Sequence, residues 1–139
     1  MDGVYLVDSS AFVRAHQPSV RGAWAQAAAE GRLIASPMFR FETLFSARGA
    51  GEFDRVERGL RSMEFLRFSE TVEPLAVAAM RSLARSAGLA HRVPVPDLLI
   101  AAAAAEQGMG VLHYDAHYDR LAEVLDFESR WIAPAGSLP

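Results

Sequence analysis

Residues 4 to 11, Val4-Tyr5-Leu6-Val7-Asp8-Ser9-Ser10-Ala11, set the architecture of this chain. The first four form a short apolar run, which is typical of a buried strand. The acid and the two serines after it indicate a turn, and Ser9 or Ser10 can cap a helix that begins near Ala11. A buried strand followed at once by a helix is the repeating unit of a parallel sheet.

The same alternation of strands and helices continues along the chain. Apolar runs predict further strands at 33–35, 65–68 and 111–113 and an edge strand at 130–132. Periodicity and capping residues predict later helices at about 20–30, 36–47, 53–63, 73–87, 97–107 and 118–125. Residues 93–96, Val-Pro-Val-Pro, are expected to be non-helical, because each proline biases the residue before it toward extended geometry.

These elements predict an α/β fold, a three-layer α/β/α sandwich with a short, mostly parallel sheet and right-handed crossovers. The length of 139 residues and the 51% hydrophobic content are ordinary for one globular domain. We expect a single domain over residues 1–133 and a C-terminal tail over residues 134–139.

Composition excludes several kinds of chemistry. The chain has no cysteine, which excludes disulfides, thiolate zinc sites and cysteine nucleophiles. All 14 basic residues are arginine, so a P-loop lysine and a Schiff-base lysine are excluded as well. The net charge of −3 means that nucleic acid would have to be bound by a local group of arginines. Without a secretory signal pattern or an apolar run of the ~20 residues a membrane helix needs, we expect a soluble, cytoplasmic protein with no membrane partner.

Acidic residues fall at informative places in this pattern. Asp8 directly follows the first strand, and Asp115 follows the strand at 111–113 by two residues. If both strands belong to one parallel sheet, both acids emerge at its carboxyl edge, where open α/β sheets bind ligands. Asp97 lies at the beginning of a helix, where free amides and the helix dipole favour an anion.

Glu42 is unusual because it projects from the apolar face of its helix, beside Met38, Phe39 and Phe45. A buried carboxylate without a partner costs several kcal/mol or shifts its pKa, so Glu42 requires a cation. Arg40 and Arg48 are near in sequence and offer one, and a metal ion offers another.

Each acid also has a purely structural interpretation. Asp8 is then an Asx turn that caps a helix, Asp97 an N-cap and Asp115 an ordinary loop residue. Taken together, the four acids are able to converge on one point, and clustered like charges repel unless a metal neutralises them. Ligation by oxygen alone suits Mg²⁺ or Mn²⁺, and such sites usually act on phosphates.

At these residues the chain resembles the PIN-domain family, and within it the VapC-type toxins of bacterial toxin–antitoxin pairs. The resemblance covers roughly residues 4 to 132. It is carried by Val7-Asp8-Ser9-Ser10-Ala11, by Glu42, by Val95-Pro96-Asp97-Leu98-Leu99-Ile100-Ala101-Ala102 and by Leu112-His113-Tyr114-Asp115-Ala116-His117-Tyr118-Asp119.

The resemblance implies an endoribonuclease dependent on Mg²⁺ or Mn²⁺. Asp8, Glu42, Asp97 and Asp115 would be its catalytic and metal-binding residues, directly or through water, with Ser10 supporting the first acid. A metal-activated water would hydrolyse the RNA phosphodiester and leave 5′-phosphate and 3′-hydroxyl ends. A cognate VapB-like antitoxin and a homodimer are implied as well.

The chain departs from the family pattern at one position. Many relatives carry a further acid where this chain has His117, so the resemblance leaves open whether His117 is a metal ligand, an RNA contact or a solvated loop residue. Asp119, two residues later, either takes part in a second metal site or caps a helix. The departure also motivates an alternative function, a catalytically weakened PIN module that binds RNA or a protein without cutting.

Phosphate contacts are expected from Arg14, Arg40 and Arg92, because guanidinium groups bind phosphate oxygens in two-point fashion. Arg40 lies about 200° from Glu42 on the helical wheel, which favours a position facing away from that acid. A haloacid dehalogenase-type phosphohydrolase is disfavoured, because it needs a second Asp where this chain has Ser10, and a lysine that the chain lacks.

Overall fold

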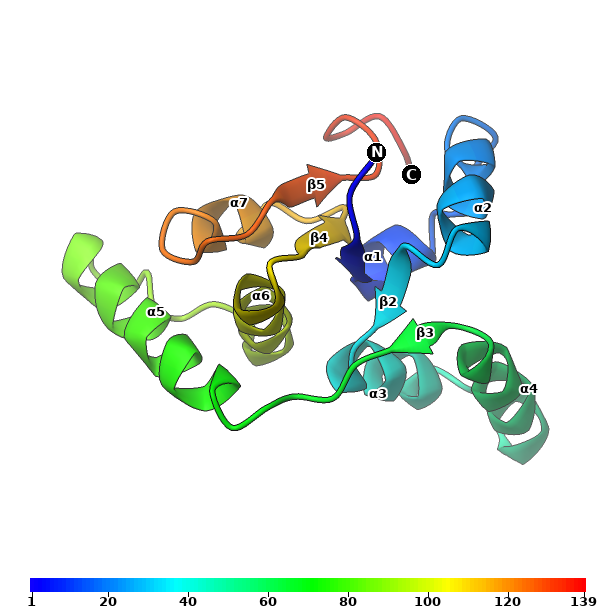
Figure 1. The fold of residues 1–139 in the computed structure, drawn as a ribbon, viewed down its shortest axis with the longest axis horizontal. Helices are drawn as coiled ribbons and strands as arrows, with labels where there is room; N and C mark the ends of the chain where they lie inside the picture. Colours follow the sequence, from blue (N-terminus) through cyan, green and yellow to red (C-terminus); the bar gives the residue numbers. More distant parts are fainter.

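A computed structural model describes residues 1–139 and contains one five-stranded sheet (Figure 1). The strand order across the sheet is β3-β2-β1-β4-β5, and every pair of neighbours is parallel. The strands are β1 (Tyr5–Val7), β2 (Leu33–Ala35), β3 (Glu64–Phe65), β4 (Gly110–His113) and β5 (Ser129–Trp131).

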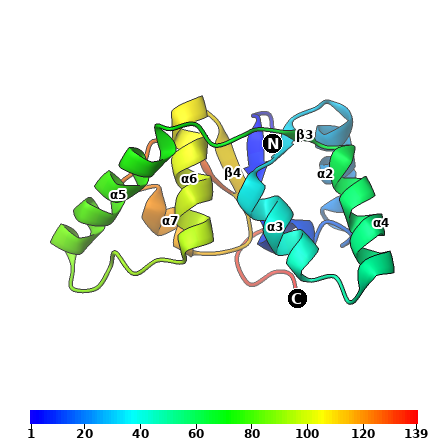
Figure 2. The ribbon, with the colours of Figure 1, turned by 90° about the horizontal axis from the view of Figure 1, so that it is seen from below.

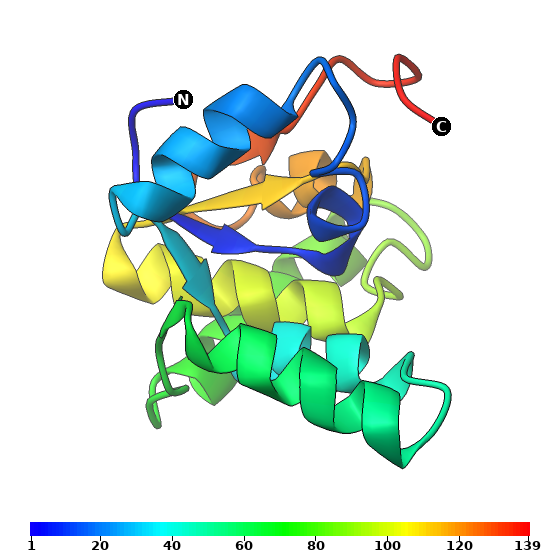
Figure 3. The ribbon, with the colours of Figure 1, turned by 90° about the vertical axis from the view of Figure 1, so that its right-hand side faces the viewer.

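Helices cover both faces of this sheet, and Figure 3 shows α2 and α6 on opposite sides of the strands. The helices are α1 (Ser9–Phe12), α2 (Arg21–Ala29), α3 (Pro37–Phe45), α4 (Ala50–Arg61), α5 (Val72–Ser86), α6 (Val95–Gln107) and α7 (His117–Leu121). The predicted α/β three-layer fold is confirmed, and the sheet is parallel throughout. None of the helices combines the length and the apolar character needed to cross a membrane.

The core follows from the alternation of side chains along each strand. Leu6 and Val111 face the side covered by α5, α6 and α7. Tyr5, Val7 and Leu112 face the other side, where they pack with residues of α1 to α4. The central strands β1 and β4 are therefore buried on both faces, which explains why their sequences read as continuous apolar runs.

Two helix starts show how local sequence sets the elements. Ser36 caps α3 by accepting the Phe39 N–H at 3.2 Å, with Pro37 in the first turn, as the sequence predicts. For α1 the prediction of Ser9 or Ser10 as the cap was wrong. Asp8 is the cap, and its carboxylate accepts the Ser10 N–H at 3.1 Å.

The prediction of a non-helical segment at 93–96 is corrected, because α6 begins at Val95. Pro94 has extended geometry and caps the helix, and Pro96 lies in the first turn, where its missing N–H costs nothing because that amide has no partner within a helix. Asp97 is therefore inside the first turn and is not the N-cap. Gly108, at φ 66°, ends the helix in the left-handed conformation.

The other differences are in element lengths. Helix α7 ends at Leu121, earlier than the predicted 125, because the following residues tighten into i→i+3 turns such as Glu123 N–H to the Arg120 carbonyl. Strand β3 has two residues, 64–65, where the sequence predicts four at 65–68, and α4 covers 50–61 where it predicts 53–63.

The carboxyl edge of the sheet gathers segments that are distant in sequence. Val7 at the end of β1 pairs with Leu112 of β4, and the Asp8 N–H donates to the Leu112 carbonyl at 2.9 Å. Figure 2 shows α3 and α6 side by side and running in opposite directions, so the second half of α3 lies near the first turn of α6. The acids at 8, 42, 97 and 115 are therefore carried to one end of the molecule.

Candidate metal centre

Three side chains meet at the carboxyl edge of the sheet. Asp97 comes from the first turn of α6, Asp115 from the loop after β4, and His117 from the first residue of α7. One ligand atom from each lies within 4.8 Å of the other two. His117 Nδ1 is 3.0 Å from Asp115 Oδ1 and 3.4 Å from Asp97 Oδ2. This set of two carboxylates and one imidazole has the composition of a divalent metal site.

Asp8 lies beside this group and is almost completely buried, with 3% of its surface exposed. Its Oδ2 accepts the Ser10 N–H and the Ser10 hydroxyl, and its Oδ1 accepts the Tyr118 hydroxyl at 2.8 Å. The same Tyr118 oxygen is 3.5 Å from Asp97 Oδ1. Asp8 thus caps α1 and also contacts, through Tyr118, the acid of α6.

Ser10 joins the two strand ends that carry the acids. Its hydroxyl donates to Asp8 and accepts the Tyr114 N–H at 2.9 Å. Because Tyr114 directly precedes Asp115, this oxygen fixes the loop after β4 against the loop after β1. The Ser10 side chain therefore orients the Asp8 carboxylate and holds it close to the loop that carries Asp115.

Glu42 of α3 presents an unpaired acceptor, because its Oε1 is buried and has no hydrogen-bond partner. Burial raises the pKa of Glu42, and the negative charge of Asp8 raises it further. The alternative of an arginine partner is not realised, since neither Arg40 nor Arg48 forms an ion pair with it. An orphaned carboxylate oxygen beside Asp8 fits a site that receives a cation.

The electrostatics of Asp97 point the same way. Burial raises its pKa to about 7, the charges of Asp8 and Asp115 add to that effect, and His117 opposes it. A carboxyl group that resists ionisation in this manner becomes favourable as an anion when a positive ion is bound beside it. The residues present therefore fit a divalent cation in both donor atoms and charge.

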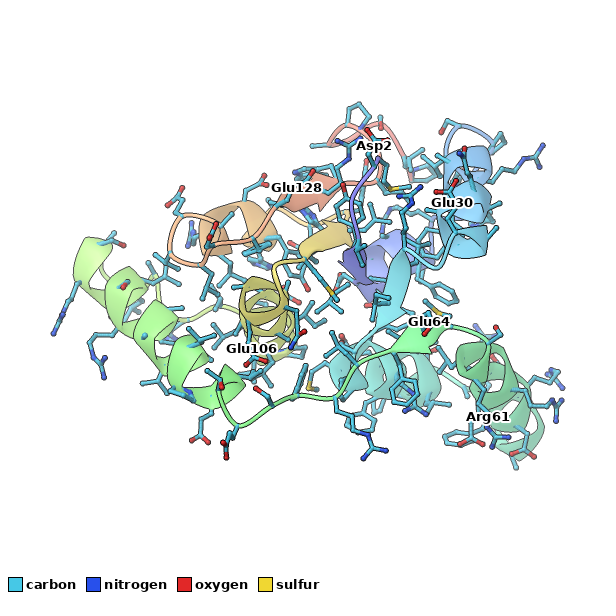
Figure 4. The ribbon with its side chains drawn as sticks, in the orientation of Figure 1. Asp2, Glu30, Arg61, Glu64, Glu106 and Glu128 are labelled. Carbon is cyan, nitrogen blue, oxygen red and sulfur yellow. The ribbon has the colours of Figure 1, made fainter.

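Solvent access differs across the site. The side chain of Asp97 is 10% exposed, that of Asp115 is 35% exposed and that of His117 is 48% exposed. The site is therefore closed on the side of α6 and open on the side of α7, so a large substrate is able to approach from the open side. Five other acids are labelled in Figure 4: Asp2, Glu30, Glu64, Glu106 and Glu128. Four of them lie before or at the beginning of a strand, and the fifth lies near the end of α6. They are therefore at the opposite edge of the sheet from this site.

Sequence reasoning missed Tyr118, which is completely buried and bridges two of the acids. Burial raises its pKa well above the ordinary value, as do the charges of Asp8 and Asp97, so the phenol stays protonated and donates. In the sequence it reads as a core aromatic of a short helix. The one feature of the sequence that indicates a role for Tyr118 is its position three residues after Asp115, in the segment His117-Tyr118-Asp119.

His113 was also missed, and it supports the loop that carries Asp115. Its Nδ1 accepts the Asp115 N–H at 3.1 Å, and its Nε2 lies 2.7 Å from the Ser129 hydroxyl. Burial lowers the pKa of His113 to about 4, so the ring is neutral. Ser129 in turn donates to Asp119 at 2.7 Å, and Asp119 also accepts the Trp131 indole N–H at 3.0 Å.

The carboxylate of Asp119 is therefore directed to β5. The structure does not bring it into the group formed by Asp97, Asp115 and His117.

The three arginines expected to contact phosphate lie in different settings. The Arg14 guanidinium lies 4.3 Å from the ring centre of Tyr114 and donates from Nη1 to the Ser10 carbonyl at 2.8 Å, next to the acids. Arg92 is exposed in the turn that leads into α6. Arg40 lies 5.5 Å from the ring centre of Phe65 in β3 and forms no ion pair with Glu42.

Comparison with known proteins identifies relatives over nearly the whole chain. Residues 5–124 match the family described as "PIN domain". Ribonuclease VapC18 of Mycobacterium tuberculosis is 36% identical over 136 residues, covering 97% of this chain and 99% of the relative. Ribonuclease VapC51 of the same organism is 34% identical over 134 residues, covering 96% of each protein.

Solved structures share the fold at lower sequence identity. The DNA-bound VapBC of Salmonella typhimurium has a TM-score of 0.73 at 15% identity, covering 94% of this chain and 99% of the matched chain. VapBC-5 of Mycobacterium tuberculosis has a TM-score of 0.66 at 20% identity, covering 93% and 98%. At these identities the likeness establishes the fold.

Proposed function

The chain belongs to the PIN domain family, and on this premise we propose that it is a metal-dependent endoribonuclease that acts as the toxin of a VapBC-type toxin–antitoxin pair. The observation that carries the proposal is the meeting of Asp97, Asp115 and His117 within 4.8 Å, with Asp8 and the unpaired Glu42 beside them. The relatives over the full length of the chain are named ribonucleases, which supports the same activity.

In this proposal Asp8, Glu42, Asp97 and Asp115 hold Mg²⁺ or Mn²⁺, directly or through water. When bound there, the ion would supply an activated water and neutralise the charge that develops on the phosphate. Ser10 and Tyr118 orient Asp8 by donating to its two oxygens. The low exposure of Asp97 keeps water from competing on the side of α6, so the RNA strand enters over His117 and Asp115.

RNA is bound by arginine in this proposal. Arg14 lies next to the acids, where Nη1 donates to the Ser10 carbonyl, and the other terminal nitrogen of the guanidinium is left to donate to a phosphate oxygen. Arg92 is exposed ahead of α6, where it can contact the phosphate backbone of the bound RNA. Arg40 lies beside Phe65 of β3, so it would contact only an RNA that extends as far as β3.

The partners follow from the same assignment. Structures with this fold are described as VapBC complexes, which supports a VapB-like antitoxin for this chain. We also propose a homodimer, to which the exposed Phe41 and Phe45 of α3 offer apolar surface. Residues 1–133 would form the nuclease domain and residues 134–139 its tail, and an RNA substrate and an antitoxin place the protein in the cytoplasm.

One observation favours a second candidate, a PIN module that binds RNA or a protein without cutting. His117 stands in the cluster with Asp97 and Asp115, where a third acid would give a stronger charge. Such a module would keep the fold and the arginines and lose turnover.

Induced expression followed by sequencing of RNA 5′ ends separates the two candidates. The variants are Asp97→Asn and, as a matched control, Asp54→Asn on the exposed side of α4. We expect new 5′-phosphate ends with the wild type and with Asp54→Asn, and none with Asp97→Asn. Identical maps of RNA ends for the wild type and Asp97→Asn would exclude the nuclease.

A further inference from the structure

We propose that His117 is a metal ligand through Nδ1 and makes this centre select Mn²⁺ over Mg²⁺. The inference rests on the proposed metal-dependent nuclease and deepens it, because it assigns the class of ion to one residue of this chain. It concerns the position at which the chain departs from an all-carboxylate set.

Geometry places the correct ring atom toward the acids. Nδ1 of His117, and not Nε2, lies 3.0 Å from Asp115 Oδ1 and 3.4 Å from Asp97 Oδ2. Ligands at neighbouring positions of an octahedron lie about 3.0 Å apart when the metal–ligand bonds are about 2.1 Å long. The ring nitrogen therefore stands at the spacing of a neighbouring ligand, and not merely at the rim of the site.

The backbone keeps the imidazole in this orientation. The His117 N–H donates to Asp115 Oδ1 at 2.9 Å, so the two residues form a closed turn at the beginning of α7. Asp115 is itself held by the neutral ring of His113, which accepts its N–H. His117 therefore approaches the acids from a supported loop, while about half of its side chain remains open to solvent.

The chemistry of the donor atoms then sets the preference. Mg²⁺ favours oxygen ligands, whereas an imidazole nitrogen increases affinity for first-row transition ions. An imidazole in place of a carboxylate also reduces the negative charge of the centre, which weakens the electrostatic binding of both ions alike. The nitrogen donor is therefore what raises the preference for Mn²⁺ over Mg²⁺.

Pulsed electron paramagnetic resonance of Mn²⁺ tests the ligand directly. Protein treated with EDTA is loaded with one equivalent of Mn²⁺, and electron spin-echo modulation from a coordinated ¹⁴N is recorded. His117→Gln is compared with the wild type and with a matched control, His16→Gln, whose histidine is exposed in the loop after α1. We expect the nitrogen modulation in the wild type and in His16→Gln, and its loss in His117→Gln.

Calorimetric titration with Mn²⁺ and with Mg²⁺ tests the preference. The preference for Mn²⁺ is the Kd for Mg²⁺ divided by the Kd for Mn²⁺. This ratio is expected to fall by roughly 10-fold in His117→Asp. An unchanged ratio would overturn the selectivity. Circular dichroism melting verifies that both His117 variants are folded, and if one is not, the other variant is used for both measurements.

The outcomes distinguish this inference from the proposed function. If Mn²⁺ binds, Asp97→Asn abolishes binding and the wild type shows no nitrogen modulation, His117 is not a ligand while the metal centre stands. If Asp97→Asn leaves Mn²⁺ binding unchanged, both the inference and the proposed centre are wrong.

Discussion

Replacing the buried acid of α6 by its neutral amide is expected to stabilise the protein when no metal is present. Asp97 is 7% exposed, and burial together with the charges of Asp8 and Asp115 raises its pKa to about 7. Asp97→Asn keeps the shape of the side chain and an oxygen that can accept a hydrogen bond from Tyr118. It removes the negative charge, which burial and the neighbouring acids make unfavourable.

The magnitude follows from the shift in pKa. Because the pKa of Asp97 rises from 3.8 to about 7, the folded protein holds this proton over that pH range while the unfolded chain has released it. The free energy of unfolding therefore falls as pH rises through that range. Each unit of pKa corresponds to about 1.4 kcal/mol, so the full loss is on the order of 4 kcal/mol. Above pH 7 the loss is complete, and below pH 4 it is absent.

Urea denaturation in EDTA at pH 5, 6, 7 and 8 measures this effect. We expect the free energy of unfolding of Asp97→Asn to exceed that of the wild type by roughly 1–4 kcal/mol at pH 8. This difference should decrease toward zero as the pH is lowered to 5. Asp54→Asn, on the exposed side of α4, should follow the wild type at every pH. With millimolar Mn²⁺ the wild type should gain stability by mass action and Asp97→Asn should not. Parallel pH profiles for the wild type and Asp97→Asn in EDTA would refute the reasoning.

Two further substitutions test the surroundings of the site, and a third, with its own control, tests the packing at the beginning of β4. Tyr118→Phe removes the donor to Asp8 and should lower the free energy of unfolding by about 1–3 kcal/mol and weaken Mn²⁺ binding, measured by urea denaturation and calorimetry; unchanged values would contradict the bridging role. Ser10→Ala should lower the free energy of unfolding by a similar amount, because the Ser10 hydroxyl bonds both to Asp8 after β1 and to Tyr114 after β4. An unchanged free energy of unfolding in the same experiment would show that these two hydrogen bonds are not needed for stability. Gly110→Ala should destabilise by about 1–3 kcal/mol, since its Cβ would lie 2.7 Å from the Tyr5 ring, whereas Gly59→Ala in an open position of α4 should stabilise by up to about 1 kcal/mol; a reversed order of melting temperatures would contradict the packing at β4.

The positions of Asp8 and Asp115 could be predicted because they depend on strand direction alone. Once β1 and β4 are parallel neighbours, residues that follow them must emerge at one edge, whatever their side chains do. The apolar neighbours of Glu42 likewise identified a carboxylate that lacks a partner, and its Oε1 is indeed unpaired. Patterns with a period of two or 3.6 residues therefore carried most of the placement.

The interactions that orient the acids could not be predicted in this way. Tyr118 contacts Asp8 across 110 residues of sequence, and His113 reaches Ser129 of β5, so both contacts depend on how layers pack. The start of α6 was misplaced because the rule for residues before proline was applied to Val95, whereas Pro96 is acceptable in a first turn. Local rules conflict at such a position, and tertiary packing decides between them.

An anomalous difference map from crystals soaked in Mn²⁺ tests the metal centre most directly. A peak bonded to the carboxylates of Asp97 and Asp115, adjacent to Asp8, and missing from crystals of Asp97→Asn, is the result expected here. No peak at millimolar Mn²⁺, or a peak at the opposite edge of the sheet, would contradict the account.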